Sequence, residues 1–247
     1  MTFHLLRLKS LPIYEQLLLE ELLLRSDTGN WCLVNEGSTP AIVMGISGKK
    51  EELVNTEKAA EQGIPLIKRF SGGGTVVVDE NTLFITFICQ KQIHPFSAYP
   101  EPIMKWTEEL YRGAIDHPEF RLRENDYVIG ERKFGGNAQY IKKDRWLHHT
   151  SILWDYSPDK MQCLLHPKKT PSYRAGRPHE EFLCRLSEYF ADKQAFITRM
   201  VAEVEKRFAV SEVSLEQALS MNRDPVRQST QFISYDLASK EPSNGAK

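Results

Sequence analysis

The stretch Ile67–Asp79, IKRFSGGGTVVVD, places three consecutive glycines between two runs with the composition of β-strands. Glycine in or beside a strand costs backbone entropy, so we expect this run where φ must be positive or where a ligand approaches the bare backbone. Arg69 and Ser71 add a fixed cation and a hydroxyl beside the glycines. Such a platform suits an anionic or carboxyl-bearing ligand. A strained hairpin turn with a solvated arginine is the alternative, and this stretch alone does not decide between the two.

Composition excludes several classes of protein. The 247 residues include 41% hydrophobic and 26% charged side chains, which is ordinary for a soluble globular protein. The formal net charge of −1 gives no global field for nucleic acid or an anionic membrane, so neither is a predicted partner. The four cysteines show no C-x-x-C spacing, which argues against zinc and a disulfide framework and favours a reducing compartment.

The predicted location and oligomeric state follow from what the sequence lacks. No apolar run approaches the roughly 20 residues of a membrane helix, and the first residues lack the features of a signal peptide. We therefore expect a cytoplasmic protein, or one of an organelle matrix if a presequence is removed. No long apolar helix face is left without a use, which favours a monomer.

Segments with helical and strand periodicity alternate along the chain, and they predict an α+β fold of mixed or antiparallel sheets flanked by helices. The ten terminal residues, ASKEPSNGAK, have the composition of a disordered tail. Helices are predicted over residues 12–25, 56–62, 99–115, 158–165, 179–190, 193–208 and 214–221. Strands are predicted over residues 31–36, 41–47, 65–70, 75–80 and 82–90, and again between 120 and 154.

A second glycine-bearing stretch lies between residues 120 and 154. Lys133 comes two residues before the pair Gly135 and Gly136, and Asn125 and Asp126 lie a strand's length upstream. A lysine on a strand, beside small residues that let a ligand lie against the backbone, is well placed to neutralise a carboxylate or an α-phosphate. An ordinary surface lysine is the alternative.

Taken together, the ordered blocks resemble the lipoate-protein ligase A family of the biotin/lipoyl attachment enzymes. The resemblance covers most of the chain. It implies a biotin/lipoyl ligase catalytic domain, of the class II aminoacyl-tRNA-synthetase-like fold, over residues 1–210. Residues 211–247 are then a short C-terminal extension and not a full accessory domain. The blocks are RFSGGGTV (69–76), Asp79, Asn81–Thr82, Asn125–Asp126, Lys133 with Gly135, Gly136 and Ala138, and His148–His149.

The resemblance also implies an activity. Such ligases use ATP to activate the carboxyl group of lipoate or octanoate as an acyl-adenylate. They then transfer the acyl group to a lysine of a lipoyl domain, as in the 2-oxoacid dehydrogenase complexes or the glycine cleavage H protein. Mg²⁺ is expected to enter with the nucleotide, since the sequence shows no all-protein metal cage and no metal site is predicted. The short C-terminus leaves open whether a separate accessory subunit takes part.

Carried over residue by residue, the resemblance makes Lys133 the catalytic residue, which holds the acyl carbonyl oxygen and the α-phosphate in both steps. Stabilising the charge that develops there is worth roughly 3 kcal/mol or more per group. The implied ATP and acyl-adenylate ligands are Arg69, Ser71, Gly74, Thr75, Val76, Val77, Asn125, Asp126 and Lys133. The implied acyl-chain pocket consists of Gly72, Gly73, Gly136 and His149.

Three positions depart from the family pattern. The second block reads KFGGNAQ, so two family serines are replaced by Gly135 or Gly136 and by Asn137, and Val78 stands where the ligases often carry histidine. These changes keep Lys133 but alter the donors to the adenylate.

An octanoyl or lipoyl transferase, which moves a preformed acyl group from a carrier protein or another lipoyl domain, is the main rival. Related transferases take the acyl group on a cysteine. The matching place here, after His166 and Pro167, holds Lys168. Cys163 is near it, but we expect it to be a buried thiol within a helix. We also expect buried thiols at Cys32 and Cys89, which lie within apolar strands, and at Cys184, which lies within a helix. A non-catalytic module that binds acyl-proteins is a remoter alternative, because Arg69, Ser71 and Lys133 are all present.

Two further groups of side chains have open roles. His148 and His149 are adjacent on a predicted strand and must point to opposite faces, so they are poor joint metal ligands. We expect one to pack under the site and the other to face it. The basic loop is either solvated, or binds an acidic lipoyl domain or nucleotide phosphate; it contains Lys168, Lys169, Arg174 and Arg177.

Overall fold

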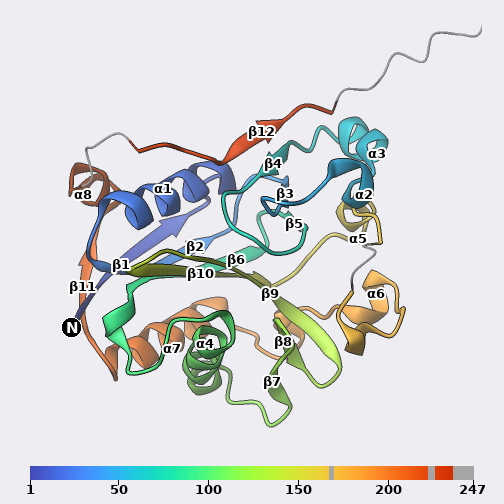
Figure 1. The fold of residues 1–247 in the computed structure, drawn as a ribbon. Coiled ribbons are helices and arrows are strands. Elements are labelled where there is room, and N and C mark those ends of the chain that lie inside the picture. The colour runs from blue at the N-terminus through green and yellow to red at the C-terminus, as the bar shows by residue number, and fades with distance from the viewer. Residues whose placement is uncertain (167–169, 222–225, 236–247) are drawn as a thin grey trace, which may run out of the picture.

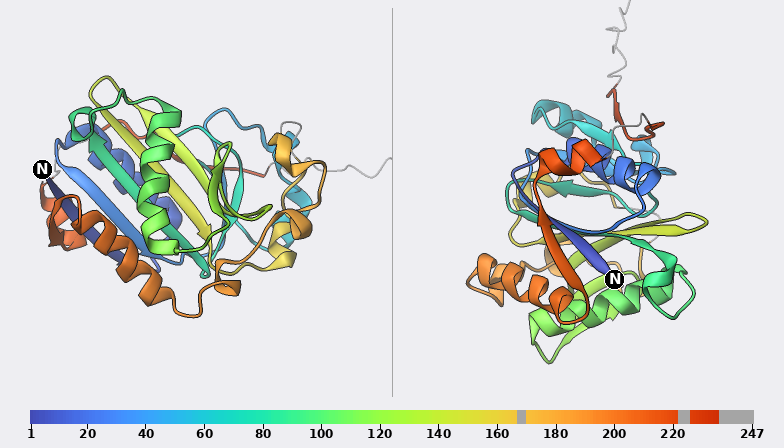
Figure 2. Two further views of the ribbon diagram at one scale, coloured as in Figure 1. Left: turned by 90° about the horizontal axis from the view of Figure 1, so that it is seen from below. Right: turned by 90° about the vertical axis from the view of Figure 1, so that its left-hand side faces the viewer.

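The computed structural model describes residues 1–166, 170–221 and 226–235. It has two β-sheets with helices packed on them, as Figures 1 and 2 show, which confirms the predicted α+β class. The tail predicted to be disordered lies outside the described residues. Among the described residues, no helix has both the length and the apolar character to cross a membrane.

The bounds of the elements are as follows. The strands are β1 (Thr2–Lys9), β2 (Asn30–Glu36), β3 (Ala41–Met44), β4 (Leu66–Lys68), β5 (Val76–Val78), β6 (Thr82–Gln90), β7 (Phe120–Arg123), β8 (Asp126–Ile129), β9 (Arg132–Ile141), β10 (Arg145–Leu153), β11 (Ala209–Val213) and β12 (Gln231–Ile233). The α-helices are α1 (Ile13–Ser26), α2 (Lys50–Leu53), α3 (Thr56–Glu61), α4 (Pro100–Ile115), α5 (Pro158–Met161), α6 (His179–Phe182), α7 (Lys193–Glu205) and α8 (Leu215–Met221). Short 3₁₀ turns occupy Lys91–Ile93, Ser172–Arg174 and Leu186–Glu188.

The large sheet has eight strands in the order β11-β1-β2-β6-β10-β9-β8-β7, and the small sheet has four in the order β12-β4-β3-β5. In the large sheet, β1 runs parallel to both β2 and β11, and the other pairs are antiparallel. In the small sheet β3 is parallel to β4 and antiparallel to β5. Both sheets are therefore mixed.

Helices cover both faces of the large sheet. One face packs against α4 and α7, whose apolar sides form a single core with the inward residues of the strands (Figure 2). The other face packs against α1, and this second core continues into the small sheet. A third core lies beneath the small sheet and includes Cys163, Tyr173 and Phe182. The space between the two sheets is thus enclosed from several sides.

Most helices begin and end near the predicted residues, but the 179–190 segment does not. It forms only α6 and the turn Leu186–Glu188, with extended residues between them. The backbone there pairs with the beginning of β9, before the residues of β9 that pair with β10: Leu183 bridges Lys133, and the Cys184 N–H donates to the Lys133 carbonyl at 2.9 Å. Tertiary pairing overrides the helical pattern here, because it satisfies backbone groups of both segments. Helix α5 is likewise shorter than predicted and ends before Cys163.

The residues that follow α7 add a strand to each sheet. Strand β11 pairs with β1, and β12 pairs with β4. Glu21 of α1 holds the approach to β12: its buried carboxylate accepts from the N–H groups of Ser229, at 2.9 Å, and Thr230, at 3.2 Å. The same carboxylate pairs with Arg25 at 2.7 Å.

Replacing Glu21 with alanine is therefore expected to lower the free energy of unfolding by about 2 kcal/mol, since hydrogen bonds to a charged acceptor are lost and their donors stay buried. Denaturant titration measures the loss, and limited proteolysis is expected to cut after residue 226 more readily. Glu15→Ala removes an exposed carboxylate of the same helix and serves as the control. Equal stability of the two variants would contradict the anchoring role.

Candidate active site between the two sheets

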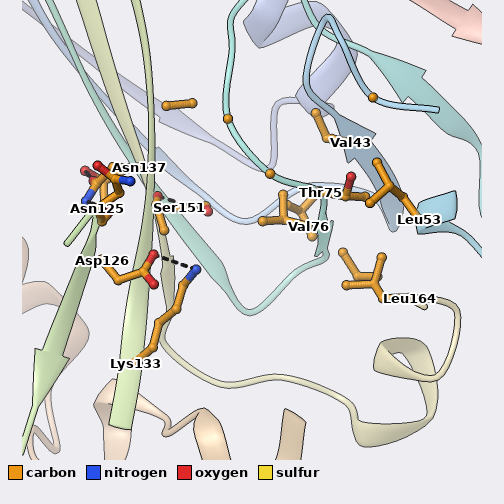
Figure 3. A pocket seen from close by; sticks show the side chains of 18 of the residues that line it. Val43, Leu53, Thr75, Val76, Asn125, Asp126, Lys133, Asn137, Ser151 and Leu164 are labelled. Atoms are coloured by element: carbon orange, nitrogen blue, oxygen red, sulfur yellow. Dashed lines mark hydrogen bonds and ion pairs between the residues drawn. The ribbon is translucent and has the colours of Figure 1, made fainter. Parts of the chain in front are cut away.

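A cavity of about 910 Å³ is bordered by both sheets, by α1 and by residues 170–183. It brings the glycine run and Lys133 together, although some 60 residues separate them in the sequence. Figure 3 shows Lys133 reaching from β9 toward Asp126, with Thr75, Val76 and Leu164 bordering the opposite side of the cavity.

The glycine run connects β4 and β5, which lie on either side of β3 and do not pair with each other. Arg69 is 4% exposed, so the alternative of a hairpin turn with a solvated arginine is wrong. Its guanidinium group lies within the loop and donates to the carbonyls of Gly72, at 2.8 Å, and Gly74, at 2.9 Å. Further bonds run to the Ser71 hydroxyl at 3.1 Å and the Val43 carbonyl at 3.3 Å. Burial lowers the pKa of Arg69 to about 10, which leaves the side chain cationic at neutral pH.

The glycines of this loop have different roles. Gly73 has a φ of +105°, and a Cβ there would lie 2.7 Å from the Arg69 Nη2 atom. A Cβ on Gly74 would meet no protein atom within 4 Å, and one on Gly72 would come only to 4.0 Å from the Gln139 carbonyl. Gly73 is thus required by the protein itself, whereas Gly72 and Gly74 leave bare backbone toward the open cavity.

Gly45, which sequence reasoning missed, supports the loop from behind. A Cβ on Gly45 would lie 2.3 Å from the Gly73 carbonyl oxygen, so no other residue fits between β3 and the loop. Its position directly after the apolar strand AIVM was the available signal.

Lys133 is held on the other side of the cavity. Its ammonium pairs with the Oδ1 atom of Asp126 at 2.8 Å, and its side chain is 22% exposed. The other carboxylate oxygen, Oδ2, accepts from the Tyr173 hydroxyl at 2.8 Å. A Cβ on Gly136 would lie 3.3 Å from the lysine Nζ atom. The missing side chain at Gly136 therefore makes room for the ammonium group.

A buried carboxylate, that of Glu20, lies behind His149, which lines the cavity. The Oε2 atom of Glu20 pairs with the His149 Nδ1 atom at 2.9 Å, and Oε1 accepts from Thr86 at 2.7 Å and from Gln16 at 2.8 Å. Burial alone would raise the pKa of Glu20, but His149 and these donors together hold it below its ordinary value. This role could not be predicted from sequence, because Glu20 stands among the glutamates of an amphipathic helix.

His148 and His149 point to opposite faces of β10, as predicted. His148 is fully buried beneath the cavity, where its Nδ1 lies 2.9 Å from Gln139 and its Nε2 3.4 Å from Thr107. Burial lowers the pKa of His148 to about 3, so its ring is neutral. His149 instead lines the cavity.

All but one of the predicted site residues border this one cavity. Ser71 lies behind the loop and receives the Arg69 Nε–H, so it shapes the site without lining it. The predicted residues that line the cavity are Arg69, Gly72, Gly73, Gly74, Thr75, Val76, Val77, Asn125, Asp126, Lys133, Gly136 and His149.

The structure also shows the surroundings of the cysteines and of Arg174 in the basic loop. All four cysteines are buried, and burial raises the pKa of Cys32 and of Cys184 to about 12 and raises that of Cys163 as well. Arg174 is buried and lines the cavity, so it is not a solvated side chain. Lys168 and Lys169 lie outside the described residues. Among the described residues, no group of three or more His, Cys, Asp or Glu side chains is arranged to hold a metal ion.

The family model of the lipoyl protein ligase A/B catalytic domain matches residues 12–209, and the chain belongs to this family. It is 31% identical over 158 residues to lipoate-protein ligase LplJ of Bacillus subtilis, which covers 62% of this chain and 46% of that protein. It is also 29% identical over 231 residues to inactive lipoate–protein ligase 2 of Plasmodium falciparum, covering 69% of this chain and 60% of the relative. The chain thus spans about half the length of the curated relatives it matches.

Solved structures share the fold. A crystal structure of lipoate-protein ligase A bound with ATP superimposes with a TM-score of 0.74 at 17% identity, and the match covers 90% of this chain and 93% of the other. Lipoate-bound LipL1 of P. falciparum gives 0.70 at 19% identity, with 90% and 69% covered. At these identities the likeness supports the fold alone.

The glycine loop gives a matched pair of variants. Gly73→Ala forces a side chain into a left-handed conformation and against Arg69, and should lower the free energy of unfolding by about 1–3 kcal/mol. Gly74→Ala places its methyl in open space, so its stability should change by no more than about 0.5 kcal/mol. Thermal and denaturant unfolding compare the two. Equal losses would show that Gly73 is not the constrained position.

The Glu20–His149 pair predicts a pH dependence. Because the folded-state pKa of Glu20 is lowered, its contribution to stability is present above the ordinary glutamate pKa of about 4.3 and is lost as the pH falls through the lower folded value. Glu20→Gln should be less stable than the wild type at pH 7 and should lack this acid-dependent loss. Unfolding titrations between pH 7 and 3 would contradict the assignment if both proteins lost stability in parallel.

Proposed function

We propose that this chain is a lipoate-protein ligase, which activates lipoate or octanoate with ATP and transfers the acyl group to a lysine of a lipoyl domain. The observation that carries the proposal is the Lys133 ammonium, paired with Asp126 and placed across one cavity from the glycine loop. Membership of the lipoyl ligase catalytic family supports it.

The two sides of the cavity suit the two ends of an acyl-adenylate. Apolar side chains of α1 and both sheets offer contacts for an acyl chain; they include Ile13, Leu17, Val43 and Phe84. Lys133, Arg69 and the bare backbone of the glycine loop suit the carboxyl and phosphate groups. Thr75 borders the same cavity, and its buried hydroxyl oxygen has no hydrogen-bond partner among the described residues, which suits contact with a bound ligand.

Lys133 serves both proposed steps. In the first, a carboxylate oxygen of the acid attacks the α-phosphorus of ATP, and pyrophosphate leaves with the electrons of the broken P–O bond. In the second, the neutral ε-amine of the acceptor lysine attacks the acyl carbonyl, AMP leaves, and the amine loses a proton. Negative charge shifts among the carbonyl and phosphate oxygens in both steps, and an ammonium group fixed beside them offsets it.

Mg²⁺ is proposed to enter only with the nucleotide. Asp126 and Glu124 are acidic side chains on the Lys133 side of the cavity, and the two oxygens of Asp126 already accept from Lys133 and Tyr173. The residues present therefore fit a metal that takes most of its ligands from phosphate and water. Bound Mg²⁺ would neutralise charge on the leaving phosphates.

The partners, domain boundary and location remain part of the proposal. The acceptor is a lipoyl domain of a 2-oxoacid dehydrogenase complex or the glycine cleavage H protein. Residues 1–210 form the catalytic unit, and the assay is run with and without a separate accessory subunit. One solved structure with the same fold is described as a bi-partite lipoate protein ligase with its E2 lipoyl domain, from Thermoplasma acidophilum. We propose a cytoplasmic monomer.

The transferase alternative finds less support. A thioester mechanism needs an accessible thiolate, and every cysteine is buried with a raised pKa, Cys89 included. The binding-module alternative has one observation in its favour, namely that a relative 29% identical is named as inactive. Lys133 and its partner Asp126 argue for chemistry in this chain.

The test supplies the full chain with Mg²⁺, an apo lipoyl domain and either ATP plus lipoate or octanoate, or synthetic acyl-adenylate, and follows the mass of the domain. We expect acylation with both donors. Lys133→Ala should lower the rate about 10²–10³-fold. Lys160→Ala removes a lysine of similar exposure, 21%, which pairs with Asp79; neither residue lines the cavity, so this variant should keep the rate.

The outcomes separate the alternatives. Transfer from acyl-adenylate but not from ATP and free acid would assign activation to another chain. Acylation from octanoyl-carrier protein without ATP would favour the transferase. No acylation from any donor would overturn the enzyme assignment and leave the binding module.

A further inference from the structure

The 170–178 segment is linked to Lys133 through Asp126, the first residue of β8, and it is also bound by Glu124 of the preceding turn. Both acidic side chains reach the 3₁₀ turn Ser172–Arg174. The Glu124 carboxylate accepts from the Ser172 N–H at 2.7 Å and also from the Ser172 hydroxyl. Asp126 accepts from the Tyr173 hydroxyl. The segment is therefore clamped to the strand that carries the partner of Lys133.

Tyr173 is built into this position. Its side chain is buried, its ring lies 5.2 Å from that of Phe182, and the Arg123 guanidinium stands over it at 4.6 Å from the ring centre. Burial, together with the Asp126 carboxylate, raises the pKa of Tyr173 far above its ordinary value. The hydroxyl therefore keeps its proton and donates to Asp126 at any pH at which the protein works.

Asp126 consequently has one oxygen committed to each neighbour. Oδ1 takes the Lys133 ammonium and Oδ2 takes the Tyr173 hydroxyl, both at 2.8 Å. A carboxylate held at one oxygen cannot rotate freely. The direction of the ion pair between Asp126 and Lys133 is therefore fixed by Tyr173, which comes 40 residues after Lys133 in the sequence. Tyr173 itself does not line the cavity.

We propose that Tyr173 is a positioning residue, which fixes the Lys133 ammonium in the cavity by holding the Asp126 carboxylate. The 170–178 segment thereby becomes part of the working site, although its tyrosine contacts no substrate. The effect on catalysis rests on the proposed ligase function, whereas the effect on the lysine side chain does not.

The kinetic test uses Tyr173→Phe, which keeps the ring packing and removes only the hydroxyl. The rate of acyl transfer at saturating substrate should fall about ten-fold, with little change in KM, because a hydrogen bond to a charged acceptor is lost. In a double-mutant cycle, Asp126→Asn with Tyr173→Phe should be no slower than Asp126→Asn alone. Additive losses, or an unchanged rate in Tyr173→Phe, would overturn the proposal.

Tyr189→Phe is the matched control. The Tyr189 hydroxyl also binds a side chain of β9, accepting from Arg132 Nη2 at 2.8 Å, but that arginine lies outside the cavity lining. This variant should keep the wild-type rate. If Tyr189→Phe lost as much rate as Tyr173→Phe, the loss would reflect any disturbed contact with β9 rather than the position of Asp126. That result would also count against the proposal.

A second measurement is independent of enzymatic activity. Brief acetylation with acetic anhydride, read by peptide mass spectrometry, should label Lys133 several-fold faster in Tyr173→Phe than in the wild type, because its ion pair is loosened. Lys160, which is similarly exposed and paired with Asp79 at 2.8 Å, is the internal reference and should not change. Unchanged labelling of Lys133 would overturn the proposal even if the wild type proved inactive. A wild type without transferase or ligase activity but with faster Lys133 labelling in the variant would overturn only the proposed function.

Discussion

The buried Arg69 guanidinium is the constraint on which the site depends. A cation removed from water costs several kcal/mol unless its hydrogen bonds are replaced. Arg69 replaces them with three backbone carbonyls and the Ser71 hydroxyl, and two of those carbonyls belong to the glycine loop. The loop can therefore not relax without leaving a buried charge unpaired. Its glycines are needed because backbone must wrap closely around a side chain and still present a bare surface to the cavity.

On the opposite side of the cavity, the cation Lys133 is paired with a carboxylate, whereas Arg69 is bound by backbone carbonyls of the loop. Asp126 holds Lys133 in place, yet it also neutralises that charge while the cavity is empty of substrate. In the proposed reaction, a phosphate or carboxylate group of the substrate would compete with Asp126 for the ammonium group. The arrangement suits a group that offsets charge as it develops rather than one that binds an anion tightly from the start. Glu20 has the corresponding role toward His149, where it keeps a polar group satisfied beside apolar side chains.

Much of this arrangement could be predicted from local sequence. The glycine run with Arg69 and the Lys133 block both place glycines and a cation within or beside predicted strands, where such residues are uncommon. The structure brings both stretches to one cavity. What could not be predicted depends on contacts distant in sequence. In the sequence, Glu20 has the pattern of a solvated helix residue, and only the structure shows that it pairs with His149. Residues 179–190 have a helical pattern in the sequence, but in the structure their backbone pairs with the beginning of β9. Tyr173 lies in an irregular segment, where no periodicity reports which side is buried.

The family comparison gives this distinction a functional meaning. A relative named as inactive and relatives named as ligases match the same chain at similar identity, so the overall fold does not decide between activity and its loss. Whether a member of this fold is active therefore depends on a few side chains of the site and on the residues that position them. In the proposed site, Lys133 supplies the charge, Asp126 pairs with its ammonium group, and the Tyr173 hydroxyl of another segment donates to Asp126. A chain of this family can thus keep its lysine and still lose the geometry, which makes the residues behind the lysine as informative about activity as the lysine itself.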